Sequence, residues 1–166
     1  MPNMLCFSRN RCTTVEQVDA QTLRSSCRIQ DTLMDACVEV LVKVPDLELV
    51  DVKSEIRRSD IGGQIGVIED VEKAIGSRIG PGIKKIIRGL IEHSPHAEQI
   101  AILFEECCNG VILSFTKDVL VHVPKDRAGE KESFTAIVRA NPRLYNSCAA
   151  LSADSPLMAG VELERS

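Results

Sequence analysis

The stretch ACVEVLVKVPDLELVDVKSEIRR, residues 36–58, decides the fold that this chain is expected to adopt. In its first half, valine recurs at every second position (Val38, Val40, Val42 and Val44). β-Branched residues with a period of two are typical of a strand that buries one face. Pro45 and Asp46 interrupt the run, and the alternation resumes through Val50, Val52 and Ile56. The segment therefore predicts an antiparallel hairpin near residues 36–57 with one buried face.

After this hairpin, the apolar spacing changes to three and four residues, which is the pattern of a helix with one buried stripe. A first helix is predicted near 61–76 and a second near 81–92. The first stripe is Ile61, Ile65, Ile68, Val71 and Ile75, and the second is Ile83, Ile86, Ile87, Leu90 and Ile91.

A third helix is predicted near 95–118, where Ser94 and Pro95 supply an N-cap and a first-turn proline. Asn109-Gly110 leaves two alternatives open. The pair could end the helix and start a strand, or the helix could continue through a tolerated glycine. Because Val111 and Phe115 keep a spacing of four, continuation is favoured.

The remaining segments carry weaker signals. Residues 1–32 are polar and read as a strand-like or irregular lead-in, and residues 124–133 read as a charged surface loop. Residues 134–140 could form a short strand, and a loop-rich tail follows. The expected fold is α+β, a single domain over 1–166 in which a small antiparallel sheet packs about three helices on one face.

Composition limits the classes of function. Of the residues, 44% are apolar and 27% are charged, and the formal net charge is −4. No basic field draws the chain to nucleic acid, and at 3% aromatic residues a stacking platform is not expected. No run resembles a signal peptide or a membrane span, and the odd count of seven cysteines favours free thiols. We therefore expect a soluble cytoplasmic protein with no nucleic-acid or membrane partner.

The segment IEHSPHAEQIAILFEECCNG, residues 91–110, holds two of the three histidines and two of the seven cysteines. His96 and Cys107 are eleven positions apart, which is roughly 16 Å along a helix at ~1.5 Å per residue. Ligands of one metal ion must lie within about 2.0–2.3 Å of it, so a straight helix cannot bring both to one ion. Cys107 and Cys108 are accordingly expected to be packing residues.

Across residues 33–160 the order of signals resembles an uncharacterised prokaryotic family, a domain of unknown function. That family has a Leu-x-Gly-x-x-Ile-x-x-Gly segment, a Gly-Cys-Thr-His-Leu helix start and a late Asp-Arg-Cys-His-Ala-Leu motif. The matching stretches here are AIGSRIGPGI (74–83), HSPHAEQIAILF (93–104) and YNSCAAL (145–151). A fainter, fold-level similarity runs to U-type iron–sulfur cluster assembly scaffolds, which also place a small antiparallel sheet before packed helices.

The resemblance implies a metal, cluster or thiol site built from recurring cysteine and histidine residues. In this chain His96 keeps the histidine of the helix start, but Ser94 stands where its cysteine would be. Cys148 keeps the late cysteine, but Ala149 replaces the histidine beside it. Because a closed zinc or iron–sulfur site needs about four protein ligands, the balance would come from other residues or the site is lost. The candidates for the balance are Cys37, Cys27 and His93.

Three hypotheses about function follow. The leading one is a binding or assembly module without catalytic machinery, with an unknown protein partner or a homo-oligomer formed through an aliphatic face. The alternative is a metal or iron–sulfur handling protein that uses His96 and Cys148, helped by His93 and Cys37, with a transition metal or an iron–sulfur cluster as cofactor. A further alternative is a thiol-dependent enzyme with Cys148 as nucleophile and His96 as its base.

Overall fold

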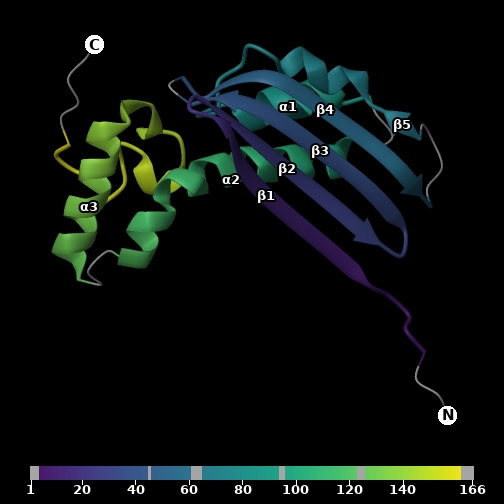
Figure 1. Cartoon of the computed structure of the whole chain (residues 1–166), viewed down its shortest axis with the longest axis horizontal. Helices are drawn as coiled ribbons and strands as arrows, with labels where there is room; N and C mark the ends of the chain where they lie inside the picture. Colours follow the sequence, from purple (N-terminus) through teal and green to yellow (C-terminus); the bar gives the residue numbers. More distant parts are fainter. Residues whose placement is uncertain (1–3, 45, 61–64, 94–95, 123–125, 162–166) are drawn as a thin grey trace.

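The computed structural model describes residues 4–44, 46–60, 65–93, 96–122 and 126–161 (Figure 1). The fold is α+β: one five-stranded antiparallel sheet with helices against one face. The strands are β1 (Arg9–Asp19), β2 (Thr22–Asp31), β3 (Met34–Lys43), β4 (Glu48–Ser59) and β5 (Gly66–Val67). Each strand pairs with the next one in sequence, so the sheet is a simple meander in the order β1-β2-β3-β4-β5.

The predicted hairpin near 36–57 is confirmed as β3 and β4, with the valines of β3 buried at alternate positions. One detail of the prediction is wrong. Leu41 pairs with Asp51 whereas Val42 pairs with Leu49, so Val50 is the extra residue of a β-bulge. The bulge shifts the alternation, and the buried face of β4 therefore carries Leu49, Val52 and Ile56.

The lead-in is not irregular, because it forms the two strands β1 and β2. In β2 the buried positions are Leu23, Ser25, Cys27 and Asp31, and the buried serine and aspartate weaken the apolar alternation. In β1 nearly every residue is exposed. A strand at the edge of a sheet buries little of its surface, so its sequence shows little periodicity.

The helices are α1 (Ile83–Ile91), α2 (Ala97–His122) and α3 (Arg127–Ala140). The first two confirm the helices predicted near 81–92 and 95–118, and α2 passes through Asn109 and Gly110 without a break. The predicted cap at Ser94-Pro95 lies outside the described residues. The helix predicted near 61–76 is only partly confirmed, as the 3-10 helix η1 (Glu69–Ala74). Gly66–Val67 form β5 instead, and residues 61–64 lie outside the described part.

The charged segment 124–133 is also not a loop where it is described, because α3 begins at Arg127. The carboxylate of Asp126 caps the helix by accepting a hydrogen bond from the Gly129 amide at 2.9 Å. Phe134 and Val138, four residues apart, are its buried positions, so the strand predicted over 134–140 is wrong as well. Two 3-10 turns follow, η2 (Pro142–Leu144) and η3 (Ala149–Leu151).

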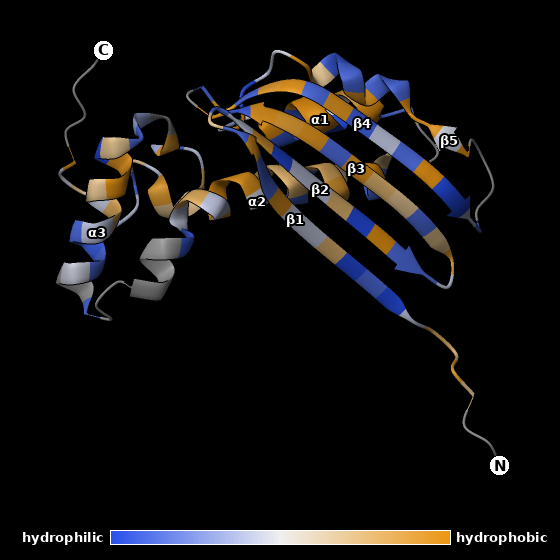
Figure 2. Ribbon diagram, viewed as in Figure 1, coloured by the Kyte–Doolittle hydropathy of each residue, from blue (hydrophilic) through white to orange (hydrophobic). Residues whose placement is uncertain are grey.

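The core lies between the inner face of the sheet and helices α1 and α2, where hydrophobic residues concentrate (Figure 2). α2 lies close against the sheet at Gly110, where an added Cβ would lie 3.1 Å from methyl groups of both Thr13 and Val15. Ser25, fully buried, donates its hydroxyl to the Cys107 carbonyl at 3.0 Å. The segment Ala97–Lys117 is apolar and long enough to cross a membrane, but half of it is buried in the fold, as is typical of a core helix.

Candidate functional site

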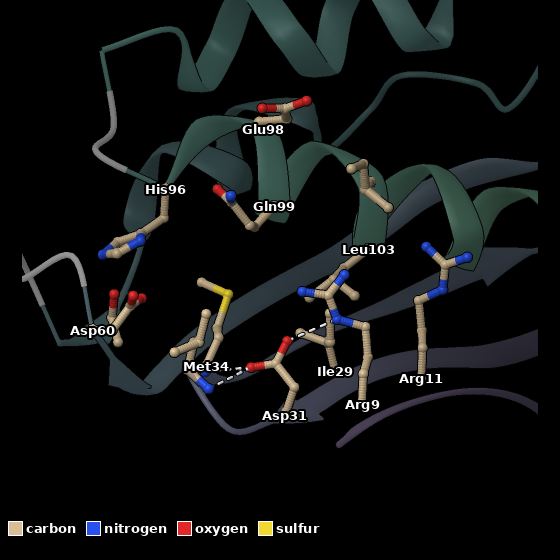
Figure 3. Close-up of a pocket in the computed structure, with 13 residues that line it drawn as sticks. Arg9, Arg11, Ile29, Asp31, Met34, Asp60, His96, Glu98, Gln99 and Leu103 are labelled. Atoms are coloured by element: carbon tan, nitrogen blue, oxygen red, sulfur yellow. Dashed lines mark hydrogen bonds and ion pairs between the residues drawn. The ribbon is translucent and has the colours of Figure 1, made fainter. Parts of the chain in front are cut away.

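A cavity of about 760 Å³ lies at the end of the sheet where β2 turns into β3, beneath the first turns of α2 (Figure 3). We call it the terminal pocket. Its polar lining comes from β1, the end of β2, the end of β4 and the start of α2: Arg9, Arg11, Asp31, Ser59, Asp60, His96, Glu98 and Gln99. Its apolar lining includes Leu33, Met34 and Ile102.

Asp31 organises the β1 side of the terminal pocket. One carboxylate oxygen accepts the backbone N–H groups of Leu33 and Met34 at 2.8 and 2.6 Å, and the other accepts Arg9 Nε at 2.8 Å. Burial alone would raise the pKa of this carboxyl, but those two amides and the Arg9 guanidinium outweigh it and hold the pKa below its ordinary value. Asp31 is therefore an anion that the fold has already neutralised.

The turn between β2 and β3 is braced from the other side as well. Arg58, on β4, donates to the backbone carbonyls of Asp31 and Thr32. Hydrogen bonds from a charged donor are stronger than those between neutral groups. The turn that forms the floor of the pocket is therefore held by arginines from the strands on both sides of the β2–β3 hairpin.

Arg11 differs from Arg9 in how firmly it is engaged. Its guanidinium lies 4.0 Å from the Glu106 carboxylate, at the limit of an ion pair, and its side chain is 45% exposed. An exposed pair of this kind contributes little to stability. Arg11 therefore keeps most of its hydrogen-bonding capacity available to a molecule in the pocket.

His96 is completely buried, and it is the residue that immediately precedes α2. Its carbonyl accepts the Ile100 amide at 3.0 Å, which is the first backbone bond of the helix. In Figure 3 the imidazole lies toward Asp60 at one end of the pocket, while Arg9 and Arg11 lie at the other end. The pocket is thus polarised, with cationic side chains on the β1 side and the carboxylates of Asp60 and Glu98 nearer the helix start.

The predicted metal ligands occupy separate places. Cys37 alternates with the buried Ala36 and Val38 of β3, so its side chain lies on the face of the sheet opposite the helices. His96 lies on the helix side, and His93 is exposed beyond the end of α1. The sheet therefore separates Cys37 from both the pocket and His96.

Cys148 belongs to the segment after α3, which lies at the opposite end of the sheet from the β2–β3 turn (Figure 1). It immediately precedes η3, and Leu144 in the same segment lines a second, smaller cavity with Val44 and Leu47 at the β3–β4 turn. β3 joins that turn to the β2–β3 turn over ten residues, which is roughly 30 Å at ~3.3 Å per residue. The structure therefore does not bring the predicted thiol and imidazole together.

The remaining candidate, Cys27, is a core residue. It is buried in β2, where the Thr13 hydroxyl donates to its sulfur at 3.2 Å. Cys107 and Cys108 are buried as expected, and burial raises the pKa of the Cys107 thiol far above its ordinary value and that of Cys108 to about 12. Within the described ranges, no three or more His, Cys, Asp or Glu side chains are grouped so that they could hold a metal ion.

Sequence reasoning missed Arg9, Arg11 and Asp31, because all three lie in the lead-in that showed no clear periodicity. A usable signal was present at Asp31-Thr32. An aspartate followed by a threonine between two segments with period-two character is typical of a tight turn in which the carboxylate accepts backbone N–H groups. That turn would have placed residues 22–31 on a strand and the arginines on the strand beside it.

Searches for related proteins returned nothing: no protein-family model, no curated protein and no solved structure matches this chain. The resemblance to the uncharacterised prokaryotic family therefore stays a prediction.

Proposed function

We propose that this protein is a non-catalytic binding module whose ligand occupies the terminal pocket. The observation that carries the proposal is the cavity of about 760 Å³ that combines an apolar wall with a half-exposed arginine. Pockets that bind small molecules are typically about 300–1,000 Å³, mostly apolar, with a few polar groups that orient the ligand.

The lining favours a small organic acid with an apolar body. Arg11 supplies planar hydrogen-bond donors to an acidic group at the β1 end. Leu33 and Ile102, which are 44% and 36% exposed, offer apolar surface beside it. The far end of the ligand, neutral or cationic, faces Asp60 and Glu98. Asp31 does not repel the acidic group, since Arg9 balances its charge.

A cytoplasmic location is part of the same proposal. All seven cysteines carry free thiols, and three of them, Cys27, Cys107 and Cys108, are buried in the core. Free thiols in such number are typical of proteins in reducing compartments.

The proposal can be tested with anilinonaphthalene sulfonate, a fluorescent anion with an apolar body. We expect saturable binding of about one molecule per chain, weakened at least about tenfold by Arg11→Gln, a loss of about 1.4 kcal/mol. Ile102→Asp should abolish binding because it places a charge in the apolar wall. The matched control is Leu113→Asp on the same helix, whose side chain is 57% exposed and lies outside the pocket. If Leu113→Asp and Ile102→Asp have equal effects, the proposal is wrong.

A further inference from the structure

The two edges of the sheet differ in how much of their backbone is hydrogen-bonded to other parts of the chain. Along β4 the segment that follows covers the edge with backbone hydrogen bonds. Glu55 and Ile56 pair with β5, Ile68 N donates to Ser54, Gly76 N donates to Leu49, and Ile79 N donates to Leu47. At the other edge, β1 pairs with β2 alone among the described residues.

The hydrogen-bond pattern identifies which backbone groups of β1 point outward. The Thr32 amide donates to the Ser8 carbonyl at 3.1 Å, in the register that continues through β1 and β2. In an antiparallel ladder, hydrogen-bonded residues alternate with residues that turn their N–H and C=O away. Even-numbered residues of β1 therefore bond to β2. The odd-numbered residues before the bulge present free N–H and C=O groups at the edge: Arg9, Arg11, Thr13, Val15 and Gln17.

The central part of β1 lacks the features that usually protect an exposed edge, because its charged residues lie toward its two ends. The strand is eleven residues long, contains no proline and no lysine, and its bulge lies at its very end, between Gln17 and Asp19. Threonine and valine at positions 13–15 are residues that favour strand pairing. The edge is therefore a competent template for one more strand.

We propose that the occupant of this edge is β1 of a second copy of the same chain, paired antiparallel. The charges along β1 support this choice, because its first half carries Arg9 and Arg11 and its second half carries Glu16 and Asp19. An antiparallel pair keeps the arginines of the two copies apart, whereas a parallel pair would lay Arg9 and Arg11 against their own counterparts. Like charges directly opposite each other on neighbouring strands destabilise a sheet.

A two-fold axis that passes through Thr13 pairs residues Arg9–Gln17 of one copy with the same residues of the other. This is the longest stretch of β1 that can pair without including the bulge after Gln17. Thr13 then faces Thr13 of the second copy, Arg11 faces Val15 and Arg9 faces Gln17. On the outer face of the sheet Cys12 faces Thr14, and Asn10 faces Glu16. No two like charges stand opposite each other in this register.

The association stops at two copies. Each chain offers one open edge among its described residues, so pairing two copies consumes both and leaves only covered edges. The two sheets become one continuous sheet with α1 and α2 of both copies on the same face. Because Arg9 and Arg11 line the terminal pocket and also belong to β1, the second copy extends the wall of that pocket. The inference goes beyond the proposed function and does not require a ligand.

The first test uses proline. Thr13→Pro removes an outward N–H that β2 does not use, so we expect the dimer dissociation constant, measured by analytical ultracentrifugation, to rise at least about tenfold. Thr14→Pro is the matched control, because it removes an N–H that β2 does use. Thr14→Pro should lower the urea midpoint of the dilute protein more than Thr13→Pro does, because Thr13→Pro loses a side-chain hydrogen bond to Cys27 but no backbone bond to β2.

The second test uses charge and holds even if the proline variants fail to fold. Cys12 and Thr14 are exposed on the outer face, away from the core. Cys12→Asp with Thr14→Asp gives one variant, and Cys12→Lys with Thr14→Lys gives another. Each variant alone should be monomeric, and an equimolar mixture should form a one-to-one heterodimer.

Either of two results would overturn the proposal. One is a wild-type chain that stays monomeric at millimolar concentration, including the case in which it captures only a peptide from another protein. The other is a wild-type dimer that both charge variants still form unaided, since the interface would then lie elsewhere.

Discussion

The two edges of this sheet differ in how the outward backbone N–H and C=O groups of the edge strand find hydrogen-bond partners. The β4 edge is satisfied within the chain, by β5 and the turns up to Ile79. The β1 edge leaves alternate backbone groups free among the described residues. The covered edge is rich in buried aliphatic side chains such as Leu49 and Ile56, whereas the open edge has none that is fully buried. Apolar burial therefore goes with the edge that closes on itself, and the edge available to a partner lacks it.

The largest expected effect separates the two edges by stability. Leu49→Ala removes a fully buried side chain from the covered edge and should lower the free energy of unfolding by about 3 kcal/mol. Val15→Ala at the open edge should lower it by less than about 1 kcal/mol, because Val15 is only partly buried. Urea unfolding of dilute protein measures both. Equal losses would contradict the assignment of stability to the covered edge.

A second prediction concerns how closely the open edge lies on α2. Gly110→Leu forces a side chain against Thr13 and Val15, where even a Cβ has 3.1 Å of room, and should lower the free energy of unfolding by about 1–3 kcal/mol. Gly89→Leu is the control, because the space around this glycine in α1 is open. Leucine is the better helix former, so Gly89→Leu should raise stability by a few tenths of a kcal/mol, up to ~1. The prediction is wrong if both substitutions stabilise the protein in thermal unfolding.

A smaller effect is expected one strand inward. Ser25→Ala removes the hydroxyl that joins β2 to the Cys107 carbonyl, which should lower the free energy of unfolding by about 1 kcal/mol. Ser26→Ala is the control on the same strand, since its hydroxyl meets Thr14 at an exposed position. In chemical denaturation, Ser25→Ala should have a clearly lower free energy of unfolding than Ser26→Ala. The reverse order would show that the hydrogen bond from Ser25 to the Cys107 carbonyl does not stabilise the fold.

The last prediction is a pH dependence at the end of the open-edge hairpin. The folded-state pKa of Asp31 is lowered, so the ionised form stabilises the folded protein above the unfolded value of about 3.9. That contribution is lost as pH falls through the lowered folded pKa. Asp31→Asn should therefore be less stable than wild type at neutral pH, and the difference should shrink below pH ~4. A stability difference between wild type and Asp31→Asn that stays constant from pH 7 to pH 3 would contradict this prediction.

The sequence predicted the parts of the fold in which apolar periodicity reports burial. The β3–β4 hairpin, α1 and α2 each bury one face, and their patterns could be read directly. Where burial is slight or shared with polar residues, the pattern failed. β1 is exposed, β2 buries Ser25, and α3 buries little beyond Phe134 and Val138 within a charged sequence.

The candidate site was predicted in part. His96 was named from the sequence, and it lines the terminal pocket. Its expected partner Cys148 belongs to the segment that lies beside the β3–β4 turn, at the other end of the sheet. The sequence could not predict this separation, because no local spacing encodes which turns share an end of a meander. The arginines of β1 could not be identified before β1 itself was known to be a strand.

The most direct measurement of the difference between the two edges is amide hydrogen exchange by NMR at low and high protein concentration. At low concentration the amides of Thr13 and Val15 should exchange freely, while those of Cys12 and Thr14 are protected by β2. Raising the concentration should protect Thr13 and Val15 and leave the amides of β4 unchanged. Exchange at Thr13 and Val15 that stays fast at every concentration would show that no second strand occupies this edge.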